Sequence, residues 1–299
     1  MLKRLGLLLV TNVLVVITFS VALQFFGVDK YLKETVYVDS AALLVFCTIW
    51  GFAGSIVSLL FSKIIAKRVY DIEIIERNTM IPELRALLDE VNRLSSKAGL
   101  KTSPDVGIYD SDEVNAFATG PTRNRSLLAL STGLLGSMNT DQIRAVLGHE
   151  IGHIANGDMV TMTLIQGTVN SFVLFISRLI ASMIYNNLKE STARIVHAYA
   201  VFALDIVFTM FGSLIVYWFS RKREYRADEA SAEIISPESM INALRFLKAG
   251  EGTLQNVAAS PLSALKIESG QKKGLFNLFS SHPIIDDRID NLRKKYNIV

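Results

Sequence analysis

The chain has 299 residues, of which 50% are hydrophobic, and its mean hydropathy is positive. Soluble chains have a more hydrophilic composition, so these values indicate a membrane protein. A formal net charge of +3 is too small to indicate nucleic-acid binding, and the single cysteine, Cys47, excludes an internal disulfide. The lack of disulfides suits a reducing compartment.

Two apolar segments without charge open the chain, at 5–28 and 40–62. Each exceeds the ~20 residues that a helix needs to cross the hydrocarbon core of a bilayer. The first segment is too long for the apolar part of a signal peptide, and no cleavage site of small residues follows it. We therefore interpret both segments as membrane spans that remain in the protein.

Two further spans are predicted at 159–186 and 195–219, and each contains one charged residue, Arg178 and Asp205 respectively. A charge inside a membrane is costly unless it faces a partner or water. The two residues either pair, or Arg178 extends to the interface while Asp205 lies in a hydrated groove. A pair of long buried core helices is the alternative to a membrane hairpin.

Lysine and arginine residues gather on one side of these spans, before the first, after the second and after the fourth: Lys3, Arg4, Lys63, Lys67, Arg68, Arg221, Lys222, Arg223 and Arg226. The positive-inside rule therefore places both termini in the cytoplasm. We divide the chain into a membrane hairpin (1–63), a first cytoplasmic part (64–158), a second hairpin (159–219) and a second cytoplasmic part (220–299). The basic clusters would also favour anionic lipid headgroups.

The cytoplasmic parts predict a mainly α fold with a small β-sheet (α+β). Hydrophobic spacing and turn residues predict helices at 80–100, 139–158, 236–250 and 283–296, and strands at 106–109, 113–120 and 126–135. Asn139 and Gln142 form a capping-box pattern at the start of the second helix, and Gly157 offers its end. The weakly patterned positions 251–281 predict an ordered loop region with mobile parts.

The sequence GHEIGHIANGD (148–158) carries the strongest chemical signal. On a helix, His149 and His153 lie on one face a turn apart, which suits a tetrahedral zinc ion. Glu150 follows the first histidine, where its carboxylate can take a proton from a water at the metal. The alternative is an accidental match on an amphipathic helix. Against it, the motif follows a predicted strand region and uses two of the chain's four histidines.

A catalytic zinc site needs a third protein ligand and an open position. His197 lies near the far end of the fourth span, so a carboxylate is the better candidate. Glu224 follows that span and can complete the site, and Asp228 can accept the free N–H of a ligand histidine. The alternative is that both acids neutralise the surrounding basic residues. A hairpin at 159–219 would bring His153 and Glu224 together.

HEIGH followed by NGD, SRKREYRAD across the hydrophobic hairpin, NAFATG (115–120) and SHPIIDDRI (281–289) resemble the HtpX family of membrane zinc metalloproteases. These are relatives of the CAAX prenyl proteases within the gluzincin class, and the resemblance covers nearly the whole chain. It implies a multi-pass membrane protein with a cytoplasmic gluzincin-type domain and one Zn²⁺ per chain. The implied ligands are His149, His153 and Glu224, with Glu150 as general base and Asp228 behind the ligands.

The resemblance also implies a substrate site. Asn115, Ala116, Phe117 and Ala118 would lie on a strand edge that pairs with an extended substrate. His282 and Arg288 match the family's SHP…R element, in which the histidine would steady the oxyanion and the arginine would lie at the substrate. By its local sequence alone, His282 is a loop residue before a helix.

The implied activity is zinc-dependent hydrolysis of peptide bonds in misfolded or damaged proteins of the bacterial inner membrane, under heat or envelope stress. The implied partners are membrane lipids, misfolded membrane proteins and other quality-control proteases, and no nucleic acid. One rival is a prenyl-protein protease, which usually needs more than four spans. Another is a non-catalytic scaffold or sensor whose structural zinc has four protein ligands, with His282 as candidate fourth.

Overall fold

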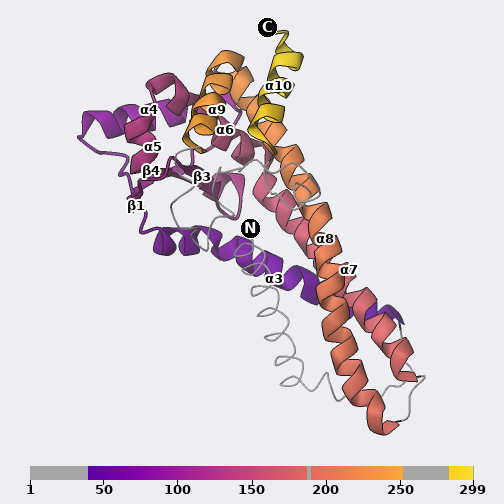
Figure 1. Ribbon diagram of the computed structural model, residues 1–299. Coiled ribbons are helices and arrows are strands. Elements are labelled where there is room, and N and C mark those ends of the chain that lie inside the picture. Colours follow the sequence, from indigo (N-terminus) through magenta and orange to yellow (C-terminus); the bar gives the residue numbers. More distant parts are fainter. Residues whose placement is uncertain (1–39, 187–189, 252–282, 299) are drawn as a thin grey trace. The chain divides into compact units, whose positions relative to one another are not determined.

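The computed structural model describes residues 40–186, 190–251 and 283–298 (Figure 1). The predicted span at 5–28, His282 and all but the first position of the predicted loop at 251–281 lie outside the described residues. The chain divides into two compact units. Among the described residues, the first contains 40–57, 164–186 and 190–216, and the second contains 58–163, 217–251 and 283–298.

Three long helices dominate the described part of the chain: α3 (Ser40–Val69), α7 (Asp158–Asn186) and α8 (Glu190–Ile234). Each contains a segment long and apolar enough to cross a membrane. They coincide with the predicted spans, but α8 continues without a break well beyond position 219. No glycine or proline occurs between Gly212 and Pro237, so nothing in the local sequence ends the helix earlier.

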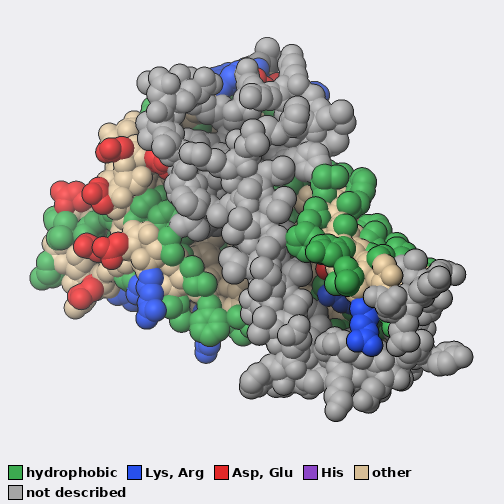
Figure 2. Space-filling model, turned by 60° about the horizontal axis from the view of Figure 1, so that its bottom comes forward, with side chains coloured by type: hydrophobic (Ala, Val, Ile, Leu, Met, Phe, Trp, Pro, Cys, Tyr) green, Lys and Arg blue, Asp and Glu red, His purple; other side chains and the backbone are tan. Residues whose placement is uncertain are grey.

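Small residues let the helices of the first unit approach closely. A Cβ atom added at Gly51 would collide with the backbone of Ser171, and one added at Gly167 would lie 2.5 Å from the Phe52 ring. Close backbone approach at small residues is typical of helix pairs in membranes. Large hydrophobic side chains lie exposed on all three helices, and Figure 2 shows one face on which such side chains gather.

The two charged residues inside the predicted hairpin contact each other. A guanidinium nitrogen of Arg178 lies 3.5 Å from a carboxylate oxygen of Asp205, and both side chains are largely buried. Of the two arrangements left open by the sequence, the structure therefore shows the pair. Mutual neutralisation lowers the cost of placing either charge among apolar helices.

The second unit is built on a four-stranded sheet with the order β1-β2-β4-β3. Its strands are β1 (Glu73–Ile74), β2 (Asp105–Tyr109), β3 (Ala116–Thr119) and β4 (Leu127–Ser131). The central strands β2 and β4 run parallel, while β1 and β3 are antiparallel neighbours at the two edges. A small sheet among many helices confirms the predicted α+β class.

Strand β4 is buried on both faces, and its residues alternate between two cores. Leu128 and Leu130 belong to a large core shared with the helices, whereas Leu127 and Ala129 face a smaller cluster that contains Phe117. This alternation follows from the two-residue repeat of a strand. The larger core fixes α6 (Thr140–Asn156) against the sheet and against α9 (Pro237–Glu251).

The predicted helices of this unit are confirmed: α4 (Pro82–Lys97), α6, α9 and α10 (Ile285–Tyr296). The predicted strand at 126–135 was too long, because α5 (Thr132–Ser137) begins directly after β4. The Ser131 hydroxyl accepts a hydrogen bond from the Leu134 N–H and so starts that helix. Strand β1 was missed, since two residues carry no readable pattern. A turn of 3₁₀ helix, η1 (Arg123–Arg125), precedes β4.

Candidate metal centre

Helix α6 has defined signals at both ends. The Asn139 side chain accepts a hydrogen bond from the Gln142 backbone N–H, and the Gln142 side chain accepts one from the Asn139 N–H, which completes the predicted capping box. At the other end Gly157 adopts a left-handed conformation with φ of 71°. Glycine tolerates this conformation, and the chain then turns directly into α7, whose first residue is Asp158.

Two glycines on α6 let α8 approach it closely. A Cβ atom at Gly148 would lie 2.9 Å from the Ser231 hydroxyl, and one at Gly152 would lie 2.9 Å from the Ala230 Cβ. The Ser231 hydroxyl donates a hydrogen bond of 2.7 Å to the Ala145 carbonyl, which ties the two helices together. Because the helices meet here, acids one and two turns earlier on α8 reach the histidines of α6.

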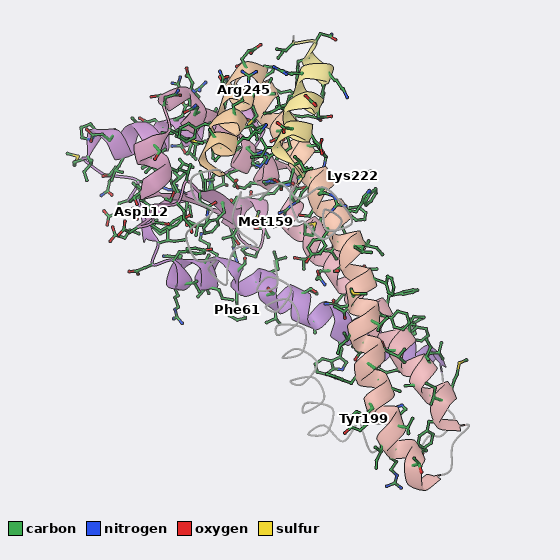
Figure 3. The ribbon with its side chains drawn as sticks, viewed as in Figure 1. Phe61, Asp112, Met159, Tyr199, Lys222 and Arg245 are labelled. Atoms are coloured by element: carbon green, nitrogen blue, oxygen red, sulfur yellow. The ribbon has the colours of Figure 1, made fainter. Side chains whose placement is uncertain are left out.

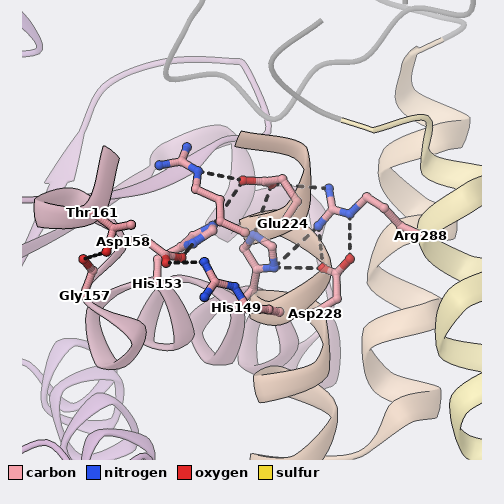
Figure 4. Close-up of polar contacts among 10 residues, drawn as sticks. His149, His153, Gly157, Asp158, Thr161, Glu224, Asp228 and Arg288 are labelled. Atoms are coloured by element: carbon pink, nitrogen blue, oxygen red, sulfur yellow. Dashed lines mark hydrogen bonds and ion pairs between the residues drawn. The ribbon is translucent and has the colours of Figure 1, made fainter. Parts of the chain in front are cut away.

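His149, His153 and Glu224 form a compact buried cluster (Figure 4). The Nε2 atom of His149 lies 3.6 Å from one Glu224 oxygen, and the Nε2 atom of His153 lies 3.4 Å from the other. One ligand atom from each residue lies within 4.8 Å of the other two. The structure thus brings together the two histidines and the carboxylate that the sequence selected.

The opposite ring nitrogens of the two histidines contact carboxylates. His149 Nδ1 lies 2.9 Å from an Asp228 oxygen, as the sequence predicted, and His153 Nδ1 lies 2.7 Å from an Asp158 oxygen. These contacts fix both rings with Nε2 toward Glu224. Sequence reasoning missed the second contact. The available signal was the Gly157–Asp158 turn after the histidine helix, which starts the next helix with an acid.

Arg288 on α10 lies against Asp228. Its guanidinium donates hydrogen bonds of 2.8 and 2.5 Å to the two Asp228 oxygens, and a further nitrogen lies 3.9 Å from Glu224. Arg288 is only 1% exposed. A fully buried carboxylate needs such a paired cation, so this contact accounts for the position of Arg288. Its predicted contact with substrate stays a prediction.

The carboxylates alter the protonation of the histidines. Burial by itself would lower the pKa of His149, but hydrogen bonds to Asp228 and Glu224 outweigh it and raise this pKa to about 9. The pKa of His153 is also raised, because the charge of Glu224 and the hydrogen bond to Asp158 outweigh burial. Burial would raise the pKa of Asp228, but the charge of Arg288 holds it below its usual value. A proton and a metal ion would therefore compete for His149 near neutral pH.

The other predicted residues lie close by in the fold. Glu150 is buried on α6 between the two histidines in sequence. Ala116, Phe117 and Ala118 lie on β3, an edge strand that packs against α6, and the outer edge of β3 has no partner strand among the described residues. Asn115 precedes β3 and is buried, where its side chain donates a 2.9 Å hydrogen bond to the Tyr109 hydroxyl.

The donor set fits a zinc ion. Two imidazole nitrogens and one carboxylate are the ligands of many catalytic zinc sites, and each imidazole is held through its other nitrogen. His149, His153 and Glu224 are all buried, so the donors lie largely out of bulk solvent. Fold and site together define the class: a membrane-bound metallopeptidase of the HExxH type.

Comparisons with known proteins give the family. Peptidase family M48 matches residues 83–296. Protease HtpX homologs of Bacillus licheniformis and Bacillus subtilis are 45% and 43% identical, covering 98% and 99% of this chain and 99% and 100% of their own length. Protease HtpX of Stutzerimonas stutzeri is 44% identical over 98% of this chain and 99% of its own. The chain belongs to the HtpX proteases of peptidase family M48.

The fold also occurs among solved structures. The crystal structure of S. mikatae Ste24p matches with a TM-score of 0.59 and 19% identity, covering 95% of this chain and 66% of that chain. At this identity the likeness shows the fold alone.

Proposed function

We propose that this protein is a zinc-dependent endopeptidase of the bacterial inner membrane that cleaves misfolded or damaged membrane proteins. His149, His153 and Glu224 would hold one Zn²⁺. The observation that carries this proposal is the arrangement of the two imidazoles, whose Nε2 atoms both face Glu224 while their Nδ1 atoms contact carboxylates. Such an arrangement presents three donors to one cation.

The chemistry assigns one role to each residue. A bound zinc ion supplies Lewis acidity toward the scissile carbonyl and makes a water more acidic. Glu150 accepts a proton from the attacking water and then donates it to the leaving amine. Asp228 keeps His149 in the orientation that exposes Nε2. His282 would donate a hydrogen bond to the oxyanion, and Arg288 would lie at the substrate.

The open outer edge of β3 favours a substrate that binds in an extended conformation. A peptide can add to an open sheet edge through backbone hydrogen bonds. These bonds do not depend on the side chains of the peptide. Asn115, Ala116, Phe117 and Ala118 would line this strand site. Because a folded protein offers no free extended backbone, this mode of binding favours unfolded or misfolded chains.

The apolar helices and basic residues support a site at the membrane surface. The exposed Lys222 holds its ammonium group 4.1 Å from the centre of the Trp218 ring on α8 (Figure 3). Tryptophan and lysine together are typical of membrane interfaces, and basic residues attract anionic headgroups. We propose that membrane lipids, misfolded membrane proteins and other quality-control proteases are the partners, and that the active site and both termini are cytoplasmic.

Two rival functions make different predictions. A prenyl-protein protease would require prenylated substrates, and a structural metal site would show no hydrolysis. The relatives that match over nearly their whole length carry the name Protease HtpX, which favours the first proposal over both rivals.

The proposed function is tested by cleavage of a denatured membrane protein by the full chain in lipid vesicles with zinc. Glu150→Gln is compared with Glu233→Gln, which alters an exposed acid of α8. We expect cleavage by the wild type and by Glu233→Gln, and a loss of about 10²–10⁴-fold in Glu150→Gln with zinc retained. Equal activity in Glu150→Gln would overturn the assigned role. Hydrolysis confined to prenylated peptides would favour the prenyl protease.

A further inference from the structure

We propose that Asp158 is a positioning residue for the metal ligand His153, and that Arg226 acts through it. The metal centre would then have a second orienting arm, formed by His153, Asp158 and Arg226, beside the arm formed by His149, Asp228 and Arg288. This inference rests on the proposed metal site. It assigns a role to Asp158 and Arg226, which belong neither to the HExxH motif nor to the metal ligands.

The two oxygens of Asp158 have separate partners. One lies 2.7 Å from His153 Nδ1 (Figure 4). The other accepts a hydrogen bond of 3.2 Å from the Arg226 guanidinium. Asp158 is itself only 1% exposed. A buried carboxylate held at both oxygens cannot rotate freely, so the His153 ring keeps one orientation. Its Nε2 atom then faces Glu224.

The turn before α7 fixes the backbone of Asp158. Gly157 ends α6, and its carbonyl accepts hydrogen bonds of 3.1 and 3.2 Å from the backbone and hydroxyl of Thr161. Asp158 is the first residue of a helix whose length and composition allow it to cross a membrane. The orientation of a metal ligand therefore depends on where this apolar helix begins.

The two arms differ in their access to solvent. Arg288 and Asp228 are both buried and share two hydrogen bonds. Arg226 is 54% exposed at its side chain and makes one hydrogen bond to Asp158. Salt screens exposed charges far more than buried pairs. The contribution of Arg226 to zinc affinity should therefore fall as ionic strength rises, whereas the contribution of Arg288 should stay constant.

The test measures zinc affinity by chelator competition on the purified full chain, together with the visible spectrum after Co²⁺ substitution. The variants are Asp158→Asn, Arg226→Gln and the double variant. Asp141→Asn and Arg144→Gln serve as matched controls, because they alter partly exposed charges on α6, the histidine helix itself. Thermal unfolding in excess chelator reports whether each variant keeps its fold without metal.

We expect Asp158→Asn to lower zinc affinity about 10–100-fold and to change the Co²⁺ spectrum. Arg226→Gln should lower it about 2–5-fold at low salt and have no effect at high salt. In the Asp158→Asn background, Arg226→Gln should cause no further loss, since it acts through the missing charge. Both control variants should bind zinc like the wild type.

Three results would overturn the inference. Zinc affinity of Asp158→Asn equal to that of Asp141→Asn would remove the role of Asp158. An undiminished effect of Arg226→Gln in the double variant would show that Arg226 does not act through Asp158. If Asp158→Asn does not fold, the test rests on Arg226→Gln alone. A zinc affinity of Arg226→Gln equal to that of Arg144→Gln at low salt would then overturn the inference. Failure of the wild type to bind zinc would instead overturn the proposed function.

Discussion

At the scale of single residues, Glu224 is the acid that lies close to both histidines. Its two oxygens lie 3.6 Å and 3.4 Å from the Nε2 atoms of His149 and His153, and its side chain is 3% exposed. No other acid in the described part of the chain joins the two histidines into a three-residue cluster. The loss of Glu224 would leave two imidazoles, which is fewer donors than a catalytic zinc site uses.

We therefore predict that Glu224→Ala lowers zinc affinity by more than ~100-fold, beyond the effect of losing an orienting partner. The measurement is zinc content after dialysis against a weak chelator, followed by metal analysis. Glu229→Ala is a suitable control, since this acid lies on the same helix and pairs with Lys295. Full zinc occupancy in Glu224→Ala would exclude it as a ligand.

The buried ion pair between Arg288 and Asp228 leads to a prediction about stability. Removing one partner of a buried ion pair leaves an uncompensated charge and costs about 3–5 kcal/mol. Arg288→Met should therefore destabilise the protein by this amount, because it leaves the fully buried Asp228 without its cation. Thermal or denaturant unfolding in detergent measures the change. Adding Asp228→Asn to this variant should recover part of the loss, and a further loss of the same size would contradict the explanation.

At the scale of elements, the close contact of α6 and α8 positions the ligands. Gly152 faces the Ala230 Cβ and the Ala227 carbonyl of α8. A methyl group at Gly152 has no flexible side chain to displace, so the helices themselves must move apart. This movement would draw Glu224 and Asp228 away from the histidines.

Gly152→Ala should therefore destabilise the protein by about 1–3 kcal/mol through overpacking, although alanine favours a helix by about 1 kcal/mol. Zinc affinity should fall with stability. Gly136→Ala is the matched control, because a Cβ atom at that position of α5 meets nothing within 4 Å. Unfolding and zinc titration of both variants measure the effect. Unchanged zinc affinity in Gly152→Ala would show that the site does not depend on this contact.

At the scale of the whole molecule, orientation in the membrane decides which compartment the site serves. Three described helices are long and apolar enough to cross a bilayer, and basic residues follow the predicted spans. Lysine and arginine near span ends favour the cytoplasmic side. We predict that a fluorescent protein fused after Val299 folds and fluoresces, whereas an alkaline phosphatase fused there stays inactive. An active phosphatase would reverse the proposed topology.

The sequence by itself determined the features that depend on neighbours along the chain. The span at 40–62, the caps of α6 at Asn139 and Gly157, and the HExxH spacing are local, so periodicity and single residues predict them. The choice of Glu224 also came from the sequence, because a hairpin brings its two ends together. Strand β1 and helix α5 escaped prediction, since both are short and depend on their neighbours.

Only the tertiary structure decided which side chains surround the ligands. The contact of Asp158 with His153, its second contact with Arg226 and the burial of Arg288 against Asp228 join residues on different helices. The pairing of Arg178 with Asp205 was likewise one of two arrangements compatible with the sequence. Ring orientation and charge pairing depend on helix packing at the scale of an ångström. A pattern of residue types along one chain contains no such distances.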